Sequence, residues 1–165
     1  MSNELRSLQL AIEVATRARD EADRALQQAR SRLQNAEEQM TQLSSYADET
    51  GTRWATANAA AFSGELMMHH RNFMGRLQEA IQMQQNVLRN LQRQVEVARH
   101  MRVQREVKLK SFEHLLEKKL RERARQAARR EQKQMDEFAG QMHARQALQR
   151  RVLEQGLEYS TGAGT

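Results

Sequence analysis

The histidines are the side chains in this sequence best suited to bind a metal ion, and their spacing argues against that role. His69 and His70 are neighbours, so on a helix they point to different sides. His100, His114 and His143 lack the i, i+4 spacing of two zinc ligands on one helix face. We therefore predict that the chain binds no metal.

The other reactive groups also lack a catalytic arrangement. Carboxylates are numerous, but on an exposed helix they have no pocket that would raise a pKa for general acid–base catalysis. The absence of cysteine excludes disulfides and thiolate chemistry and fits a reducing compartment. The glycines form neither a phosphate-binding loop nor a dinucleotide-binding turn. They are residues 51, 64, 75, 140, 156, 162 and 164. The sequence therefore predicts a non-enzymatic protein without a cofactor.

A heptad pattern of apolar residues, which we call the seam, runs from Leu5 to Leu43. Eleven of its twelve a and d positions are apolar. Four successive alanines at d allow a partner backbone to approach closely, which suits a tightly packed antiparallel pair. The a residues are Leu5, Ile12, Arg19, Leu26, Leu33 and Met40, and the d residues are Leu8, Ala15, Ala22, Ala29, Ala36 and Leu43.

A second seam segment runs from Met74 to Leu116, with ten of thirteen positions apolar. Gln84, Arg102 and Arg105 interrupt it. Polar seam residues can fix the register of two helices, and an arginine can lift its charged head to water over an aliphatic stem. The thirteen positions are Met74, Leu77, Ile81, Gln84, Leu88, Leu91, Val95, Ala98, Arg102, Arg105, Leu109, Phe112 and Leu116.

Two seam segments separated by a break predict an all-α fold, a long two-helix antiparallel coiled-coil hairpin whose second helix is longer than the first. No proline interrupts it. Such a hairpin encloses no substrate-sized cavity, so function is expected on its surface. We predict a single hairpin over residues 1–155, with the first helix over about 4–49, the turn within 50–64, the second helix over about 65–155 and a flexible tail over 156–165.

The second helix is expected to extend beyond the reach of the first. After a four-residue stutter, apolar residues continue from Leu120 to Met142. A helix from Leu116 to about Val152 would project roughly 50 Å past the paired region, and its apolar stripe would need a partner. The alternative is that residues 130–155 fold back or fray.

The net charge of +6 is unevenly distributed. Residues 1–50 contain six basic and nine acidic side chains, whereas residues 99–133 contain thirteen and five. Such a basic run could face phosphates, acidic lipid or an acidic protein surface. Pairs such as Glu117 with Arg121, four residues apart, equally indicate a solvated helix face.

Nucleic-acid binding is the alternative from another functional class, and we do not favour it. The basic run has only Phe112 for base stacking and is interleaved with glutamates. No stretch approaches the roughly 20 apolar residues of a membrane span, and the amino end lacks a signal-peptide pattern. We therefore predict a soluble protein that binds other proteins.

Several local sequence motifs resemble those of a known protein family. The segments Gln39-Met-Thr-Gln-Leu-Ser-Ser-Tyr46, Gly64-Glu-Leu66 and Phe73-Met-Gly-Arg-Leu-Gln-Glu-Ala-Ile-Gln-Met-Gln-Gln85 resemble the FliJ family of bacterial flagellar type III export. The segments Leu116-Glu-Lys-Lys-Leu-Arg-Glu-Arg123 and Arg129-Arg-Glu-Gln-Lys-Gln-Met-Asp-Glu-Phe-Ala139 resemble its carboxy-terminal signature. The resemblance covers nearly the whole chain.

The resemblance implies a stalk similar to the rotor stalk of rotary ATPases, whose joined termini enter the hexameric flagellar export ATPase. It further implies binding to the cytoplasmic domain of the export gate membrane protein and recycling of export chaperones. The expected location is cytoplasmic, peripherally associated with the inner membrane at the flagellar base. The equivalent stalk of a virulence type III secretion system is the alternative.

The family's gate-binding patch corresponds to residues near the turn. Leu43 and Leu77 are seam positions, so packing could explain them, whereas Tyr46 and Phe73 are better contact candidates. This chain has Thr50 and Gly51 where relatives often have a second tyrosine, which could alter the patch or end the first helix early. The residues implied are Gln39, Leu43, Tyr46, Phe73, Leu77, Ala80 and Gln84.

The candidates for the ATPase contact come from the geometry of the exposed end. They combine apolar side chains with basic ones, as expected for a helix that inserts into a partner. They are Leu5, Leu8, Leu120, Arg121, Arg123, Arg129, Arg130, Met135 and Phe138.

Overall fold

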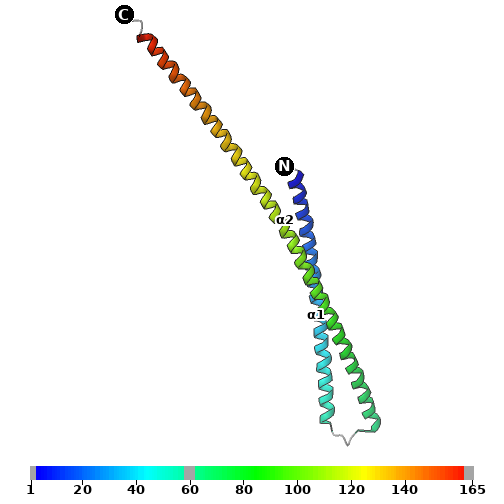
Figure 1. The fold of residues 1–165 in the computed structure, drawn as a ribbon. Coiled ribbons are helices and arrows are strands. Elements are labelled where there is room, and N and C mark those ends of the chain that lie inside the picture. Colours follow the sequence, from blue (N-terminus) through cyan, green and yellow to red (C-terminus); the bar gives the residue numbers. More distant parts are fainter. Residues whose placement is uncertain (1–2, 58–61, 162–165) are drawn as a thin grey trace. The chain divides into compact units, whose positions relative to one another are not determined.

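The described part of the protein consists of two helices, as a computed structural model shows (Figure 1). The structure describes residues 3–57 and 62–161, and within them there is no strand. Helix α1 spans Asn3–Thr56 and helix α2 spans Gly64–Thr161. The predicted all-α fold with a longer second helix is confirmed.

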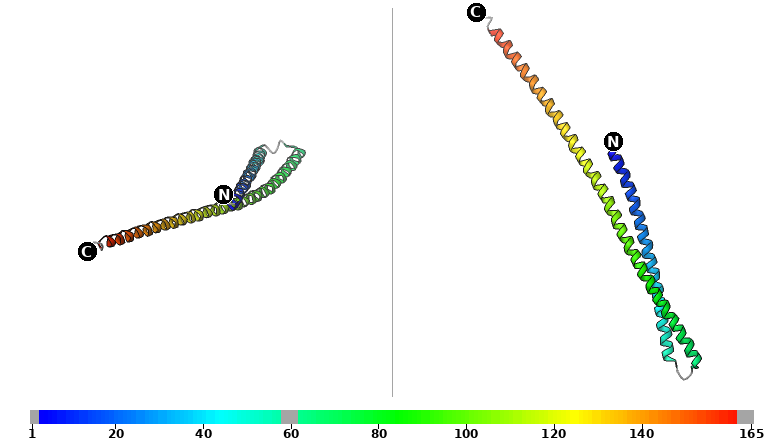
Figure 2. Two further views of the ribbon diagram at one scale, coloured as in Figure 1. Left: turned by 90° about the horizontal axis from the view of Figure 1, so that it is seen from above. Right: turned by 45° about the vertical axis from the view of Figure 1, so that its right-hand side comes forward.

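The contacts divide the chain into two compact units. Unit 1 is Met1–Glu113 and unit 2 is His114–Thr165, so α2 contributes to both. Within unit 1, α1 lies beside the first part of α2 in opposite directions (Figures 1 and 2). The contacts from the closed end onward are Tyr46 with Phe73, Ala36 with Gln84 and Asp23 with Arg102, which confirms the antiparallel pairing.

The predicted seam forms the core of unit 1. Every residue of α1 that is buried occupies an a or d position, and four of the seven are alanines. Because alanine adds little volume, the two backbones can approach closely there. Leu26, Ala29 and Val95 form a buried cluster, against which Leu33 and Ala98 pack.

Gln84 ties the register of the two helices. Its side-chain Nε2 donates a hydrogen bond to the backbone oxygen of Ala36 at 2.9 Å and lies 3.4 Å from Oε1 of Gln39. The small d residue Ala36 leaves its carbonyl accessible to the facing helix. A satisfied bond of this kind contributes about 1 kcal/mol and would be lost if the helices slipped by one heptad.

The arginines at seam positions place their charged groups at the edge of the helix pair, where they form ion pairs. Arg102 forms an ion pair with Asp23, and Arg19 reaches both Asp20 at 2.9 Å and Glu106 at 3.8 Å. The hydrogen bond to Asp20 raises the pKa of the Arg19 guanidinium above its ordinary value, because it stabilises the charged form. These half-exposed pairs favour the observed alignment but contribute little to stability.

Helix α1 is longer than predicted. It continues through Gly51 to Thr56, although the sequence led us to expect an end near residue 49. The Thr52 hydroxyl donates to the Asp48 carbonyl at 2.8 Å, and the Ala57 amide donates to the Arg53 carbonyl at 3.1 Å. The glycine therefore does not end the helix, and the expected turn begins later, with residues 58–61 lying outside the described part.

Helix α2 begins where predicted and ends later. Ser63 caps its start, because its Oγ accepts a hydrogen bond from the Leu66 amide at 3.2 Å. The expected tail over 156–165 was wrong for residues 156–161, which are helical, and residues 162–165 lie outside the described part. The alternative in which residues 130–155 fold back or fray was also wrong, because the helix is continuous there.

Overpacking tests the alanine row of the seam. We expect Ala29→Leu to destabilise the protein by about 1–3 kcal/mol, because a larger side chain in the buried cluster forces the helices apart. Ala25→Leu is the matched control, since Ala25 is exposed on the same helix and its change should stay within about 0.5 kcal/mol. Thermal denaturation followed by circular dichroism measures both, and equal stability of the two variants would contradict the close packing.

Candidate protein-binding surfaces

The residues predicted for the gate contact lie together in unit 1. A shallow groove near the closed end is lined by Gln39, Leu43, Tyr46 and Gln84, four of the seven predicted residues. Gln42 lines it too and was missed, although it lies three residues from Gln39 on the same helix face. The groove is therefore built from both helices around the Gln84 side chain.

Phe73 joins this groove through Tyr46. The two rings meet edge to face with centroids 6.0 Å apart, yet they remain 41% and 54% exposed. Exposed aromatic side chains fixed by a neighbour are well suited to a protein contact. We call Gln39, Leu43, Tyr46, Phe73 and Gln84 the aromatic patch.

The other two predicted gate residues contribute differently. Leu77 is buried in the seam, and Ala80 is half-buried. Their positions are explained by packing of α2 on α1, so a partner would meet them only at their edges.

A second aromatic cluster was not predicted. The Trp54 ring stacks on Phe62 with centroids 4.4 Å apart and on His70 with centroids 3.8 Å apart. The sequence showed aromatic residues near the reversal, but their stacking depends on the extra helical turns of α1. This cluster fixes the ends of both helices next to the turn.

The stack can be tested through the single tryptophan of the chain. We expect His70→Ala to shift Trp54 fluorescence to the red, because losing one stacked ring exposes the indole to water, and to cost about 0.5–1.5 kcal/mol. His69→Ala is the control, since that neighbouring side chain is exposed. Identical emission spectra and acrylamide quenching in the two variants would contradict the stack.

The described part of unit 2, residues 114–161, is helical throughout, and it presents apolar side chains to solvent. Residues 121–158 are all exposed, including Met135 at 69% and Phe138 at 64%. With 3.6 residues per turn, Leu120, Met135, Phe138 and Met142 share one face. This face continues through Val152 and Leu153, which the sequence analysis did not include.

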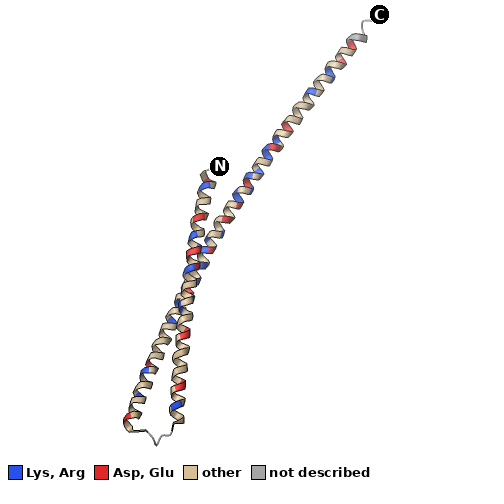
Figure 3. Cartoon of the chain, turned by 180° about the vertical axis from the view of Figure 1, so that it is seen from behind, with Lys and Arg blue, Asp and Glu red and all other residues tan. Residues whose placement is uncertain are grey.

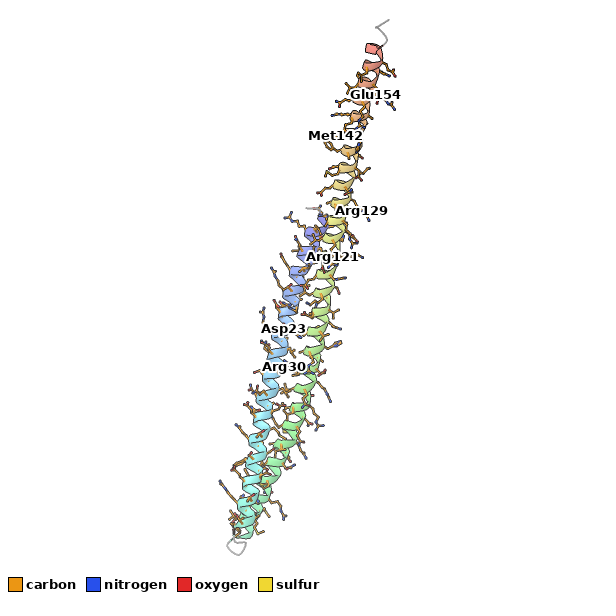
Figure 4. The ribbon with its side chains drawn as sticks, turned by 90° about the vertical axis from the view of Figure 1, so that its left-hand side faces the viewer. Asp23, Arg30, Arg121, Arg129, Met142 and Glu154 are labelled. Carbon is orange, nitrogen blue, oxygen red and sulfur yellow. The ribbon has the colours of Figure 1, made fainter. Side chains whose placement is uncertain are left out.

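Basic residues accompany the apolar face. Residues 118–133 contain eight basic and two acidic side chains, and Figure 3 shows their interleaving along α2. Arg121 pairs with Glu117, as the spacing predicted, and Lys133 lies 4.0 Å from Glu137. Figure 4 labels Arg121, Arg129 and Met142 along this helix. Unit 2 thus presents an amphipathic, basic helix.

Two candidates for the ATPase contact, Leu5 and Leu8, are buried. They are only 4% and 8% exposed, so they are packing residues of the seam. Their seam positions already gave this signal. The other candidates, Leu120, Arg121, Arg123, Arg129, Arg130, Met135 and Phe138, are exposed.

The described residues hold no group of three or more histidine, cysteine or acidic side chains placed to bind a metal ion. Across residues 3–57 and 62–161, no helix is apolar enough over a sufficient length to cross a bilayer. The candidate protein-binding surfaces are the aromatic patch in unit 1 and the amphipathic helix of unit 2.

A comparison with known protein families found a match. The family model described as "Flagellar FliJ protein" matches residues 4–148, which covers most of the chain. No curated protein matches the sequence. The match includes the aromatic patch and the helix of unit 2 as far as residue 148.

Proposed function

Because this chain belongs to the FliJ family of flagellar proteins, which are components of flagellar protein export, we propose that it acts as a non-enzymatic stalk of the type III export apparatus. In this role it binds and stimulates the export ATPase, contacts the export gate and helps to recycle export chaperones. The observation that carries the ATPase role is the exposed amphipathic helix of unit 2.

Unit 2 has the chemistry needed to enter a protein ring. Its exposed Met135 and Phe138 can bury in a partner, where large apolar anchors supply most of the binding free energy. The basic side chains of residues 118–133 can steer the helix toward acidic subunit surfaces. A single helix inside a hexameric ring would contact its subunits unequally.

Unequal contacts provide the mechanism of stimulation. A ligand changes the population of conformations only if it binds them with different free energies. A helix that favours one subunit conformation would bias the ATPase ring toward assembly or turnover without performing chemistry itself. The proposed protein therefore acts as an asymmetric binding partner.

The double substitution Met135→Asp, Phe138→Asp tests the ATPase role. We expect it to abolish stimulation of the cognate ATPase, because two charges on the apolar face cannot be buried without a large cost. The control is Ala144→Asp, Ala147→Asp, which introduces the same charges at the same spacing on the opposite side of the helix. Phosphate release measures both, and unchanged stimulation in the first variant would refute this placement of the contact.

The aromatic patch is the proposed contact with the cytoplasmic domain of the export gate. Tyr46 and Phe73 are its exposed members with the largest apolar surface, and the groove beside them supplies amide groups for hydrogen bonds. This contact would place the protein at the inner membrane without a span of its own, and chaperones would be released there to the gate.

Truncation of the two rings tests the gate contact. We expect Tyr46→Ala, Phe73→Ala to weaken binding to the gate domain by about tenfold or more, while the hairpin stays folded, because both side chains are exposed. Met83→Ala removes a side chain that is 69% exposed next to Gln84 and should leave binding unchanged. Isothermal titration calorimetry compares the variants, and equal affinities would move the contact elsewhere.

A further inference from the structure

One side of unit 1 carries an apolar groove that the hairpin itself does not fill. Its first part is lined on α1 by Leu10, Ala11, Val14 and Ala18, and on α2 by Lys108 and Phe112. Leu10 and Val14 are 60% and 59% exposed, although they are large apolar residues. They lie outside the seam, so packing of α1 on α2 does not account for them.

The groove continues toward the middle of unit 1. Its second part is lined by Ala25 of α1 and by Arg93, Val97 and Met101 of α2. The two parts adjoin, because Met101 is one turn before Arg105, which borders the first part. From Leu10 to Ala25 the groove runs for about 23 Å, the length of a helix of about 15 residues.

The groove exists because the two edges of the α1 seam differ. The edge that lines it has alanine at three successive heptad positions, Ala11, Ala18 and Ala25, so the surface is low and apolar there. The opposite edge has Thr16, Asp23 and Arg30, of which Asp23 and Arg30 are labelled in Figure 4, and Asp23 is used in the ion pair with Arg102. A third helix could therefore pack against one side of the hairpin only.

The charge of the groove indicates what kind of helix fits. Its lining includes Arg93, Arg105 and Lys108 and no acidic residue. An apolar floor beside a basic edge complements a helix with an apolar stripe flanked by glutamate or aspartate. Unit 2 of a second copy is a poor occupant, because its residues 118–133 are themselves strongly basic.

We propose that this groove is a docking site for an acidic amphipathic helix of a partner protein. Leu10, Val14, Val97 and Met101 provide the apolar contact, and Arg93 and Lys108 select acidic side chains along one edge of the helix. The proposal does not rest on the function proposed above, because neither the aromatic patch nor unit 2 takes part.

The test uses two labelled, stapled helical peptides of about 18 residues with the same leucine stripe, one carrying glutamates along its edge and one carrying lysines. Fluorescence anisotropy with the full chain should show binding of the glutamate peptide and at least about tenfold weaker binding of the lysine peptide. Equal binding of the two peptides, or binding of neither, would overturn the proposal.

Substitutions in the chain locate the site. Val97→Asp should weaken binding of the glutamate peptide by about tenfold, whereas Val107→Asp, on the same helix and outside the groove, should change it less than about twofold. Lys108→Glu should weaken binding, and Lys110→Glu, two residues away and outside the groove lining, should not. Circular dichroism confirms that each variant is folded, and equal effects within either pair would overturn the placement.

Two further measurements exclude other occupants. Sedimentation should show that Val97→Asp leaves the association state unchanged, since a dimer lost in this variant would assign the groove to a second copy. Anionic phospholipid vesicles should not compete with the glutamate peptide, and co-sedimentation of the chain with such vesicles that is lost in Lys108→Glu would assign the groove to a membrane surface. Either result would replace the partner helix proposed here.

Discussion

The row of alanines along the seam of α1 is the constraint on which unit 1 depends. Alanine at the buried positions lets the two backbones lie close together, so the Gln84 amide can reach the Ala36 carbonyl and fix the register. The same small volume limits how much apolar surface each residue buries. Stability therefore comes from the length of the pairing, and register comes from one polar bond and the edge ion pairs.

A narrow seam leaves much of each helix surface for other uses. In a layered domain a residue such as Val97 or Leu10 would be enclosed, whereas here both remain at the surface. The two edges of the seam then differ in character, one small and apolar and the other polar and ion-paired. This asymmetry allows one hairpin to offer a docking groove on one side, separate from the aromatic patch near the turn.

Unit 2 differs from unit 1 because its apolar side chains are exposed and not buried in a seam. Its helix carries ion pairs along its own surface, such as Arg121 with Glu117, and its apolar face is exposed. Isolated helices gain little stability from propensity and ion pairs alone, so burial of this face in a partner would stabilise it substantially. A basic helix with an exposed apolar face is suited to binding a partner.

The sequence by itself determined the all-α hairpin, the seam residues and the exposed apolar face of unit 2, because heptad spacing directly encodes which helix face is buried. It also located the five residues of the aromatic patch, through motifs shared with the family. Only the tertiary structure decided that α1 continues through Gly51 and that Trp54 stacks on both Phe62 and His70. It alone revealed the groove, because a groove depends on which side chains of two helices face each other across the seam, and the spacing within each helix does not specify that pairing.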